Sequence, residues 1–574
     1  MFKFRSVWTV ALFSICLNQV ALPISAQTIP FPQLPLPPTA PNLQIPPVQT
    51  VPSSPLLNPS IPPQQFPQLP KNQRTFKVKL FIFAGTPVLK LQQIEKEVAP
   101  YLGRNTNFIE LQELADRLTY LSRQKGYIYS GAYIPRLLNR QWQTTDGNTV
   151  TIRFIAGRVK KINVIGDQRL RRYVRSHLRV ASSPVLNKKR LEEGLRLLQV
   201  DPLIKTISAE LTPNPRLGLA TLDVRVTANQ SISVQPTFNN ERSPLVGTFE
   251  RRVQFYNSNL LGLGDGLSLT YRNTEGSNAG QASYRIPINP RNGTVEFDYT
   301  IVHANIVERP FNQLNISEID RSYQVTLRQP LLRQASATAT KEFAVGLTAS
   351  RQEGDERLLG MPFPISPGAD DRGRTRISAL RFFQDWNQRS NQEVLSVRSQ
   401  FSLGVGALNA TIHNSAAPDS RFFSWQGQAT WLRRLNKHNL ALLTRANLQL
   451  ASRPLVPFEQ FSLGGITTVR GYRQDALLTD NGILGSVELR VPIVQRGVNQ
   501  LLLGPFVDVG YGFNVRGANP NTNTLVGAGL GIEYEFAQRL RLRLDYGIPL
   551  IAFPNNQKRT LQENGLYLNF SYLF

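Results

Sequence analysis

The stretch Val526-Gly527-Ala528-Gly529-Leu530-Gly531-Ile532-Glu533-Tyr534-Glu535-Phe536 alternates between two kinds of residue without a break. Apolar side chains stand at every second position from Val526 to Phe536, and glycine or glutamate stands between them. Because successive side chains of a β-strand point to opposite faces, this pattern predicts a strand with one apolar face and one hydrated face.

The same alternation continues on both sides of this stretch. In residues 540–546, Leu and Tyr alternate with Arg541, Arg543 and Asp545. Residues 395–405 and 440–450 show the same alternation of apolar and polar side chains. A large soluble sandwich also alternates, but the polar face here is too charged for a dry core. Strands of about nine to eleven residues with aromatic residues near their ends are typical of a membrane barrel.

The length of this region predicts the size of the barrel. Ser231 to Phe574 spans 344 residues, which at about twenty residues per strand and connection gives about seventeen strands. A closed single-chain barrel has an even number of strands. We therefore expect an antiparallel transmembrane barrel of about sixteen strands over residues 229–574.

Aromatic residues occupy alternate positions at the end of the chain, at Phe570, Tyr572 and Phe574. An aromatic terminus on an amphipathic strand is the usual recognition signal for insertion of outer-membrane barrels. We interpret these three residues as a barrel insertion signal and expect the barrel assembly machinery and outer-membrane lipid as partners.

Two segments precede the first globular pattern. Lys3 and Arg5 stand before the apolar run 7–17, and Ala26 offers a small residue for cleavage, which predicts a signal peptide over residues 1–26. Residues 30–70 contain fifteen prolines, so we expect a disordered, extended linker over 27–74 that forms neither a helix nor a β-ladder. A proline-rich ligand for another protein is the alternative. The only cysteine, Cys16, lies in the signal peptide, so the mature chain has no disulfide.

Two small α+β modules in tandem follow the linker. The first, over 75–157, is expected to contain a strand at 76–83, helices at 90–102 and 109–124, and strands at 127–134 and 149–155. The second, over 158–228, repeats this order with a strand at 159–164, helices at 170–178 and 188–199, and strands at 204–211 and 220–226. The fold class is therefore α+β followed by all-β.

Composition argues against several classes of function. The four histidines are scattered without ligand spacing and no nucleophile motif is present, so we expect no catalytic site, no metal and no cofactor. The formal net charge of +26 fits acidic lipid or an acidic partner, but we interpret it mainly as arginine lining water-filled surfaces and expect no nucleic acid. No apolar run of eighteen residues lies beyond the first twenty, which opposes membrane-spanning helices.

The most specific local feature is a glycine-rich loop, Gly464-Gly465-Ile466-Thr467-Thr468-Val469-Arg470-Gly471-Tyr472. The later strand Gly504-Pro505-Phe506-Val507-Asp508-Val509-Gly510 directs its valines to lipid and Phe506, Asp508 and Gly510 to the lumen. If the loop folds back into the barrel, it can place Arg470 against Asp508. The alternative is a turn with an incidental arginine.

Together these residues resemble a known family, the two-partner secretion transporters, which are TpsB proteins of the FhaC/ShlB/HecB type in the BamA-like POTRA-barrel superfamily. The resemblance covers about five hundred residues and rests on the Val469-Arg470-Gly471-Tyr472 loop, the Phe506-x-Asp508-x-Gly510 strand, the tandem modules and Phe574. Shorter similarities lie in both modules, at 126–127, 132–135, 155–159 and 191–202, and residues 257–265 look like the turn region of the first barrel hairpin.

The resemblance implies a function in protein transport across the outer membrane. Periplasmic POTRA modules would capture an unfolded exported client by adding it as a strand to a sheet edge, and the barrel would pass it outward. Arg470 and Asp508 would pair in the lumen and fix the inward loop, and the client would be a large β-helical adhesin or haemolysin-like protein. A plug helix often precedes the first module in this family, but residues 28–70 are too rich in proline to form one.

Two other functions compete with this interpretation. A BamA-type insertase is the alternative in the same superfamily, and it usually carries more POTRA modules than two. A passive porin or an enzyme barrel is opposed by the modules, the Arg470 loop and the missing catalytic residues.

Overall fold

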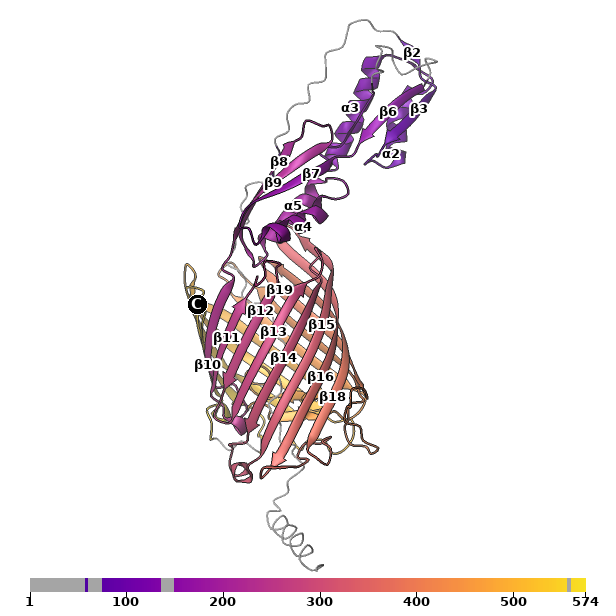
Figure 1. The fold of residues 1–574 in the computed structure, drawn as a ribbon. Coiled ribbons are helices and arrows are strands. Elements are labelled where there is room, and N and C mark those ends of the chain that lie inside the picture. The colour runs from indigo at the N-terminus through magenta and orange to yellow at the C-terminus, as the bar shows by residue number, and fades with distance from the viewer. Residues whose placement is uncertain (1–56, 60–74, 136–148, 555–558) are drawn as a thin grey trace, which may run out of the picture.

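The computed structural model describes residues 57–59, 75–135, 149–554 and 559–574. Two small α/β modules stand in line above one rim of a β-barrel (Figure 1). We call this the near rim and the opposite one the far rim. The predicted signal peptide at 1–26 and almost all of the predicted linker at 27–74 lie outside the described residues.

The first module packs two helices against a small sheet. Its sheet has the order β3-β6-β5, and β2 pairs with β4 beside it. Asn107 caps the long helix by accepting a hydrogen bond from the amide of Glu110, and Gly126, in the left-handed region, follows the helix end. The elements are β2 (Phe76–Lys77), β3 (Leu80–Gly85), α2 (Leu91–Val98), η1 (Ala99–Tyr101), β4 (Asn105–Thr106), α3 (Phe108–Gln124), β5 (Gly131–Tyr133) and β6 (Thr149–Ile155).

The second module lies between the first module and the barrel. Its helices cover one face of a sheet in the order β1-β8-β9-β7, and together they bury a core of leucine, valine and isoleucine. The elements are β1 (Leu57–Pro59), β7 (Arg158–Gly166), α4 (Arg171–Ser182), α5 (Lys188–Gln199), β8 (Ile204–Pro213) and β9 (Leu219–Ala228).

Three local expectations for the N-terminal part are wrong. Residues 57–59 of the proline-rich segment do form a ladder, in parallel with residues 209–211 of β8, because an edge strand tolerates proline. The single strand expected at 76–83 is split into β2 and β3, which pair with different strands. The strand expected at 127–134 is reduced to β5, since the backbone of 126–130 forms turns after α3.

The barrel closes as predicted. Its sheet contains seventeen segments, of which β17 has two residues and pairs only with β16, so sixteen strands form the wall. Antiparallel pairing of β10 with β28, for example Phe238 with Phe570, closes the ring. The strands are β10 (Ile232–Asn239), β11 (Glu250–Asn257), β12 (Gly266–Asn273), β13 (Ser277–Pro287), β14 (Thr294–Asn305), β15 (Ser317–Ala335), β16 (Ala339–Leu358), β17 (Met361–Pro362), β18 (Arg374–Ser390), β19 (Glu393–Val405), β20 (Phe423–Arg434), β21 (Ala441–Ala451), β24 (Asn481–Arg496), β25 (Asn499–Phe513), β26 (Thr524–Phe536), β27 (Leu540–Pro549) and β28 (Leu566–Tyr572).

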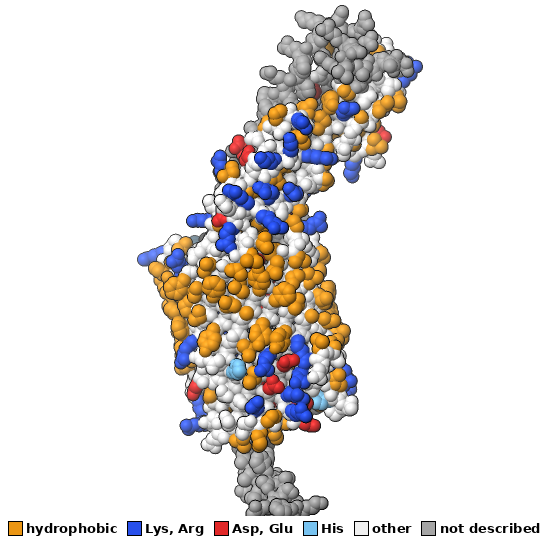
Figure 2. All heavy atoms as spheres, viewed as in Figure 1, with side chains coloured by type: hydrophobic (Ala, Val, Ile, Leu, Met, Phe, Trp, Pro, Cys, Tyr) orange, Lys and Arg blue, Asp and Glu red, His pale blue; other side chains and the backbone are white. Residues whose placement is uncertain are grey.

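The two faces of the wall differ as the alternation requires. On β25, Val507, Val509 and Tyr511 are exposed on the outside, whereas Phe506 and Asp508 are buried inside. Figure 2 shows the outward apolar side chains as a band across the visible face of the barrel, with charged side chains above and below it. This band matches the zone in which strands face lipid.

Several strands are longer than the nine to eleven residues expected. β15, β16 and β18 have 19, 20 and 17 residues, and Figure 1 shows them running to the far rim. Their far ends carry ion pairs, such as Arg321 with Asp355 and Arg351 with Glu353. These ends therefore project beyond the lipid-facing zone into water.

The connections fix how the second module meets the near rim. The turn at 258–265 joins β11 to β12, the second and third strands, and not the first hairpin as expected. Its carbonyls at Asn259 and Leu260 accept hydrogen bonds from the guanidinium group of Arg169, each at 2.6 Å.

Among the described residues, no helix has the length and apolar character needed to cross a bilayer.

Candidate functional site

The segment between β21 and β24 folds back into the barrel instead of leaving it. We call residues 452–480 the inward loop. It contains η4 (Pro457–Glu459) and a short hairpin of β22 (Phe461–Leu463) and β23 (Leu477–Thr479). Gly464, Gly465 and Gly471 all have positive φ angles, so the tight path between the two strands depends on glycine.

Arg470 lies at the tip of the inward loop and has no solvent exposure. Its guanidinium group contacts Asp508 twice, with Nε 2.8 Å from Oδ2 and Nη2 2.9 Å from Oδ1. The backbone amide of Arg470 also donates to Asp508, at 3.1 Å. The structure therefore brings together the two residues that the sequence placed in one lumen, and it seats the guanidinium carbon 3.3 Å from the centre of the Phe506 ring.

Two further carboxylates complete the surroundings of Arg470, and sequence reasoning missed both. Nη1 lies 2.8 Å from Glu488 on β24 and 3.2 Å from Asp545 on β27. One cation thus faces acids from three strands of the wall. Arg543 balances the excess of negative charge, because it contacts Glu488 at 3.0 Å and Asp545 at 2.6 Å.

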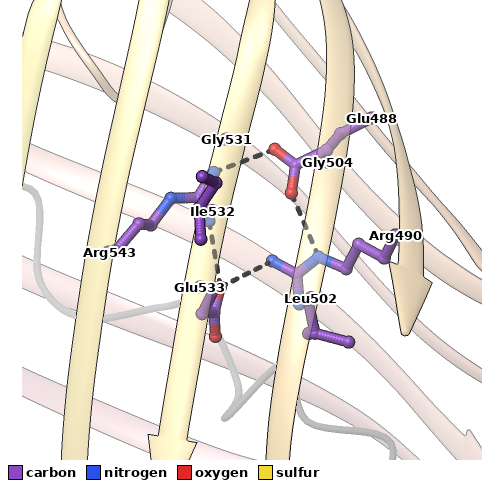
Figure 3. Close-up of a pocket in the computed structure, with 8 residues that line it drawn as sticks. All are labelled: Glu488, Arg490, Leu502, Gly504, Gly531, Ile532, Glu533 and Arg543. Atoms are coloured by element: carbon purple, nitrogen blue, oxygen red, sulfur yellow. Dashed lines mark hydrogen bonds and ion pairs between the residues drawn. The ribbon is translucent and has the colours of Figure 1, made fainter. Parts of the chain in front are cut away.

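Further pairs of acidic and basic side chains line the wall beside Arg470. Figure 3 shows a small pocket in which Arg490 and Arg543 lie between Glu488 and Glu533, with Gly504 and Gly531 on neighbouring strands. Arg490 contacts Glu488 at 3.2 Å, and Arg543 contacts Glu533 at 3.3 Å. Acidic and basic side chains of β24, β26 and β27 alternate around this pocket, so each of these four charges has a partner of opposite sign.

Glycines on the wall allow the loop to approach it closely. A Cβ atom on Gly527 would overlap the carbonyl oxygen of Arg470, and one on Gly547 would lie 2.5 Å from the amide nitrogen of Gly471. A Cβ atom on Gly510 would lie 2.9 Å from Cγ2 of Val469. The inward-facing glycines of β25, β26 and β27 therefore form the surface on which the loop tip rests.

Tyr567 and Tyr472 hold the residues next to Arg470. The amide of Gly471 donates to the hydroxyl of Tyr567 at 3.0 Å, and this hydroxyl donates to the carbonyl of Tyr472 at 2.5 Å. The hydroxyl of Tyr472 lies 2.9 Å from the carbonyl oxygen of Ile551. Val469 and Tyr472 are both buried in a cluster with Leu463 and Leu477.

Three other ion pairs, made by Arg473 and Glu459, anchor the inward loop nearer the far rim. Arg473 contacts Glu308, in the β14–β15 connection, at 2.8 and 2.6 Å, and Glu563, in the β27–β28 connection, at 3.3 Å. Glu459 makes a bidentate pair with Arg381 of β18, at 2.6 and 2.9 Å. Sequence reasoning did not single out these residues, because their partners lie in loops and strands far along the chain.

The predicted insertion residues lie apart from this cluster. Phe570 and Phe574 are exposed on the outside, and the rings of Tyr572 and Phe574 meet at 4.6 Å. The amide of Phe574 donates to the carbonyl of Val234 on the first strand. In the described part of the chain, no group of three or more His, Cys, Asp or Glu side chains is arranged to hold a metal.

Comparison with known proteins identifies the family. A model of the haemolysin secretion/activation proteins ShlB/FhaC/HecB matches residues 218–534, and a model of the ShlB-type POTRA domain matches residues 76–156. The chain belongs to the ShlB/FhaC/HecB family. It is an outer-membrane pore for secretion of an exported partner protein, with its POTRA region in the periplasm. The near rim is therefore periplasmic and the far rim extracellular.

Individual relatives agree with this assignment. The outer membrane transporter CdiB of Dickeya dadantii is 22% identical over 400 residues, which cover 68% of this chain and 68% of the relative. The structure of CdiB from Escherichia coli superimposes with a TM-score of 0.64 at 19% identity and covers 91% of this chain and 94% of that one.

BamA shares the fold at a greater distance. The structure of BamA from Haemophilus ducreyi lacking POTRA domains 1–3 has a TM-score of 0.51 at 13% identity, and it covers 87% of this chain and all of that one. Likeness at this identity extends to the fold alone. The family models favour the secretion transporter over the insertase.

Proposed function

We propose that this pore passes one unfolded partner protein through its barrel, and that the Arg470 cluster holds the inward loop in the closed, resting position. The observation that carries the proposal is the full burial of Arg470 among Asp508, Glu488 and Asp545. Removing one partner of such a buried group leaves uncompensated charge. The loop therefore stays docked until the passing polypeptide displaces it.

A passing polypeptide must displace the inward loop. The loop tip touches the inner faces of β25, β26 and β27 through Gly510, Gly527 and Gly547, and its stem pairs with β18 through Arg381. The loop thus spans the lumen between opposed parts of the wall. We infer that passage follows release of Arg470 from its carboxylates, and that the same ion pairs restore the closed state afterwards.

Capture of the client is inferred at the edge of β8. This strand already pairs in parallel with residues 57–59 of the same chain. The main-chain N–H and C=O groups along this edge of β8 can therefore pair with an extended segment. Strand addition gives affinity through main-chain hydrogen bonds. We propose that an unfolded client segment takes the place of residues 57–59 and is thereby held above the periplasmic rim.

The proposal also covers the kind of client, the insertion of the pore into the membrane and the role of each segment of the chain. A large β-helical adhesin or haemolysin-like client that folds outside the cell would give direction to transport, and the pore itself would act without enzymatic chemistry.

Phe570, Tyr572 and Phe574 would present the new chain to the barrel assembly machinery. Residues 1–26 would serve as the export signal, 27–74 as a tether, 75–157 and 158–228 as POTRA modules, and 229–574 as the barrel.

A secretion assay tests the proposed function. The chain is co-expressed with the exported protein encoded in the neighbouring reading frame, and the client is measured in the medium. We expect the client outside only when the pore is present, and trapped in the periplasm otherwise. Equal release without the pore, or assembly defects in other barrels as the main consequence of its loss, would contradict secretion and favour an insertase.

A further inference from the structure

Asp508 depends on a single cation, whereas the other two carboxylates around Arg470 do not. Glu488 also contacts Arg543 at 3.0 Å, and Asp545 contacts the same guanidinium group at 2.6 Å. Among the described residues, Asp508 forms an ion pair with Arg470 alone. Release of Arg470 therefore leaves Asp508 as the one carboxylate of the three without a counterion, inside the barrel, where an unpaired charge is unfavourable.

Arg445 of β21 is a cation without an acidic partner on the same side of the lumen. Its Nη2 atom donates to Oγ of Ser486 at 3.1 Å, and Nη1 lies 3.5 Å from the carbonyl oxygen of Thr467 in the inward loop. Its Nε atom is buried and has no hydrogen-bond partner, and in the part of the chain that the structure describes Arg445 forms no ion pair. Because buried donors nearly always have a partner, the docked state leaves Arg445 incompletely satisfied.

The strand register places Arg445, Ser486 and Asp508 in one row across three neighbouring strands. Arg445 of β21 pairs with Ser486 of β24, and Ser486 pairs with Asp508 of β25. Side chains directly opposite each other on adjacent strands lie on the same face, with Cβ atoms about 4.5–5.5 Å apart. The guanidinium group of Arg445 already reaches Ser486, so it meets Asp508 after a further movement of about one strand spacing, ~5 Å.

The row contains no other cation that could take this place. On the far side of Asp508, the next two positions are Gly527 of β26 and Pro549 of β27. The arginines on the neighbouring row, Arg490 and Arg543, are already held by Glu488 and Glu533 (Figure 3). Arg445 is therefore the cation in this row that can reach Asp508 without breaking an ion pair.

We propose that Arg445 pairs with Asp508 when Arg470 leaves, and that this exchange stabilises the displaced position of the inward loop. The inference rests on the proposed function, because it requires release of the loop. In the docked state, Arg470 occupies both carboxylate oxygens of Asp508, and its positive charge opposes the approach of Arg445. After release, both oxygens are free and the repulsion is gone.

The exchange has two consequences for transport. Arg470 must compete with Arg445 before the loop can dock again, so the pore stays open for longer. Asp508 is also neutralised while the client passes, so it does not retain basic side chains of the moving chain. Arg445 thus acts as a positioning residue of the open state, through Asp508.

Single-channel recording of the full-length chain in planar bilayers tests this role, because it measures open and closed times separately. We expect Arg445→Gln to shorten the open times by roughly fivefold or more, the effect of losing one ion pair, and to leave the closed times unchanged. Arg445→Lys keeps the charge and should restore most of the open time. Arg398→Gln is the matched control, because this arginine of β19 pairs with Asp385 and not with the cluster.

Removal of the Asp508 charge gives the second measurement. In the Asp508→Asn variant no carboxylate at this position needs a cation, so addition of Arg445→Gln should not shorten the open times further. If Arg445→Gln does not assemble, Ser486→Val decides in its place. Its branched side chain stands between Arg445 and Asp508 and blocks the same movement without altering charge, so it should also shorten the open times.

Two results would overturn the inference. One is open times that Arg445→Gln leaves unchanged, and the other is equal shortening with and without the carboxylate of Asp508. Shorter closed times with normal open times would place the action of Arg445 on the docked loop, through Thr467, and would also contradict it. Failure of the proposed function is a separate result, because Arg470→Ala would then leave the closed times unchanged and both proposals would fall. Shorter closed times in Arg470→Ala with no effect of Arg445→Gln would overturn this inference alone.

Discussion

The guanidinium group of Arg470 holds the carboxylate of Asp508 through two hydrogen bonds of 2.8 and 2.9 Å, and neither side chain is exposed to solvent. The two residues come from the tip of the inward loop and from β25 of the wall. Their contact therefore reports whether the loop is docked, and it is the first target for substitution.

Replacing Arg470 with alanine should leave the barrel assembled but reduce secretion by at least roughly tenfold. Loss of one partner of a buried ion pair costs about 3–5 kcal/mol, and this cost falls on docking of the loop because the strand ladders are untouched. A loop that cannot return to its docked position stays in the lumen in the path of the client, so secretion falls. Secreted client and the heat-modifiable mobility of the barrel are the measurements. Arg516→Ala, in an exposed loop of the same barrel, is the control. Normal secretion by Arg470→Ala would remove the loop from the mechanism.

Gly527→Ala should push the loop tip away from the wall without changing any charge. The added methyl group overlaps the carbonyl oxygen of Arg470, and overpacking of this kind costs about 1–3 kcal/mol. We expect a higher resting conductance of the pore in planar bilayers. Gly485→Ala is the matched control, because its Cβ position has no atom within 4 Å. Identical traces from the two variants would argue against close docking at β26.

Arg473→Gln should loosen the extracellular side of the closed state. Arg473 joins the inward loop to Glu308 and Glu563, which lie in two different connections at the extracellular rim. We expect more frequent openings in single-channel recordings while secretion continues, because the Arg470 cluster stays intact. Arg372→Gln, an exposed arginine of another extracellular connection, should not alter the recordings. If Arg473→Gln gates like the unmodified pore, the two connections do not help to hold the loop.

Replacing residues 57–59 with Gly-Ser-Gly should strengthen client binding several-fold. These residues pair with β8, and glycine and serine form strands poorly, so the intramolecular competitor is weakened. Fluorescence anisotropy with the N-terminal segment of the client gives the Kd, and the same replacement at residues 41–43 serves as control. An unchanged Kd would place client binding at another edge.

Much of the barrel follows from the period of two in the sequence. The alternation in Val526–Phe536 predicts which face meets lipid, and the same rule correctly places Phe506, Asp508 and Gly510 inside. The inward position of Asp508 and the single charge in the glycine-rich loop allowed a contact between Arg470 and Asp508 if the loop folded inward, but the pairing itself was implied only by the family resemblance. The structure places the two side chains in contact.

The rest of the cluster depends on relations between strands that a single strand pattern does not contain. Glu488 and Asp545 are two of many inward acids, and only the stagger of β24 and β27 brings them level with Arg470. The sequence gives a weak indication that Tyr567 points into the lumen, because this tyrosine stands on the polar side of an alternating strand. The pairing of residues 57–59 with β8 was missed because high proline content masks a short edge strand.

A reversible disulfide between Val469 and Gly510 tests the central claim, that the inward loop must leave the wall during transport. A Cβ atom on Gly510 lies 2.9 Å from Cγ2 of Val469, and the only natural cysteine, Cys16, lies in the predicted signal peptide. In the Val469→Cys/Gly510→Cys chain, we predict that oxidation abolishes secretion, that reduction restores it, and that either single variant secretes under both conditions. Undiminished secretion with the loop covalently tied to β25 would contradict the account.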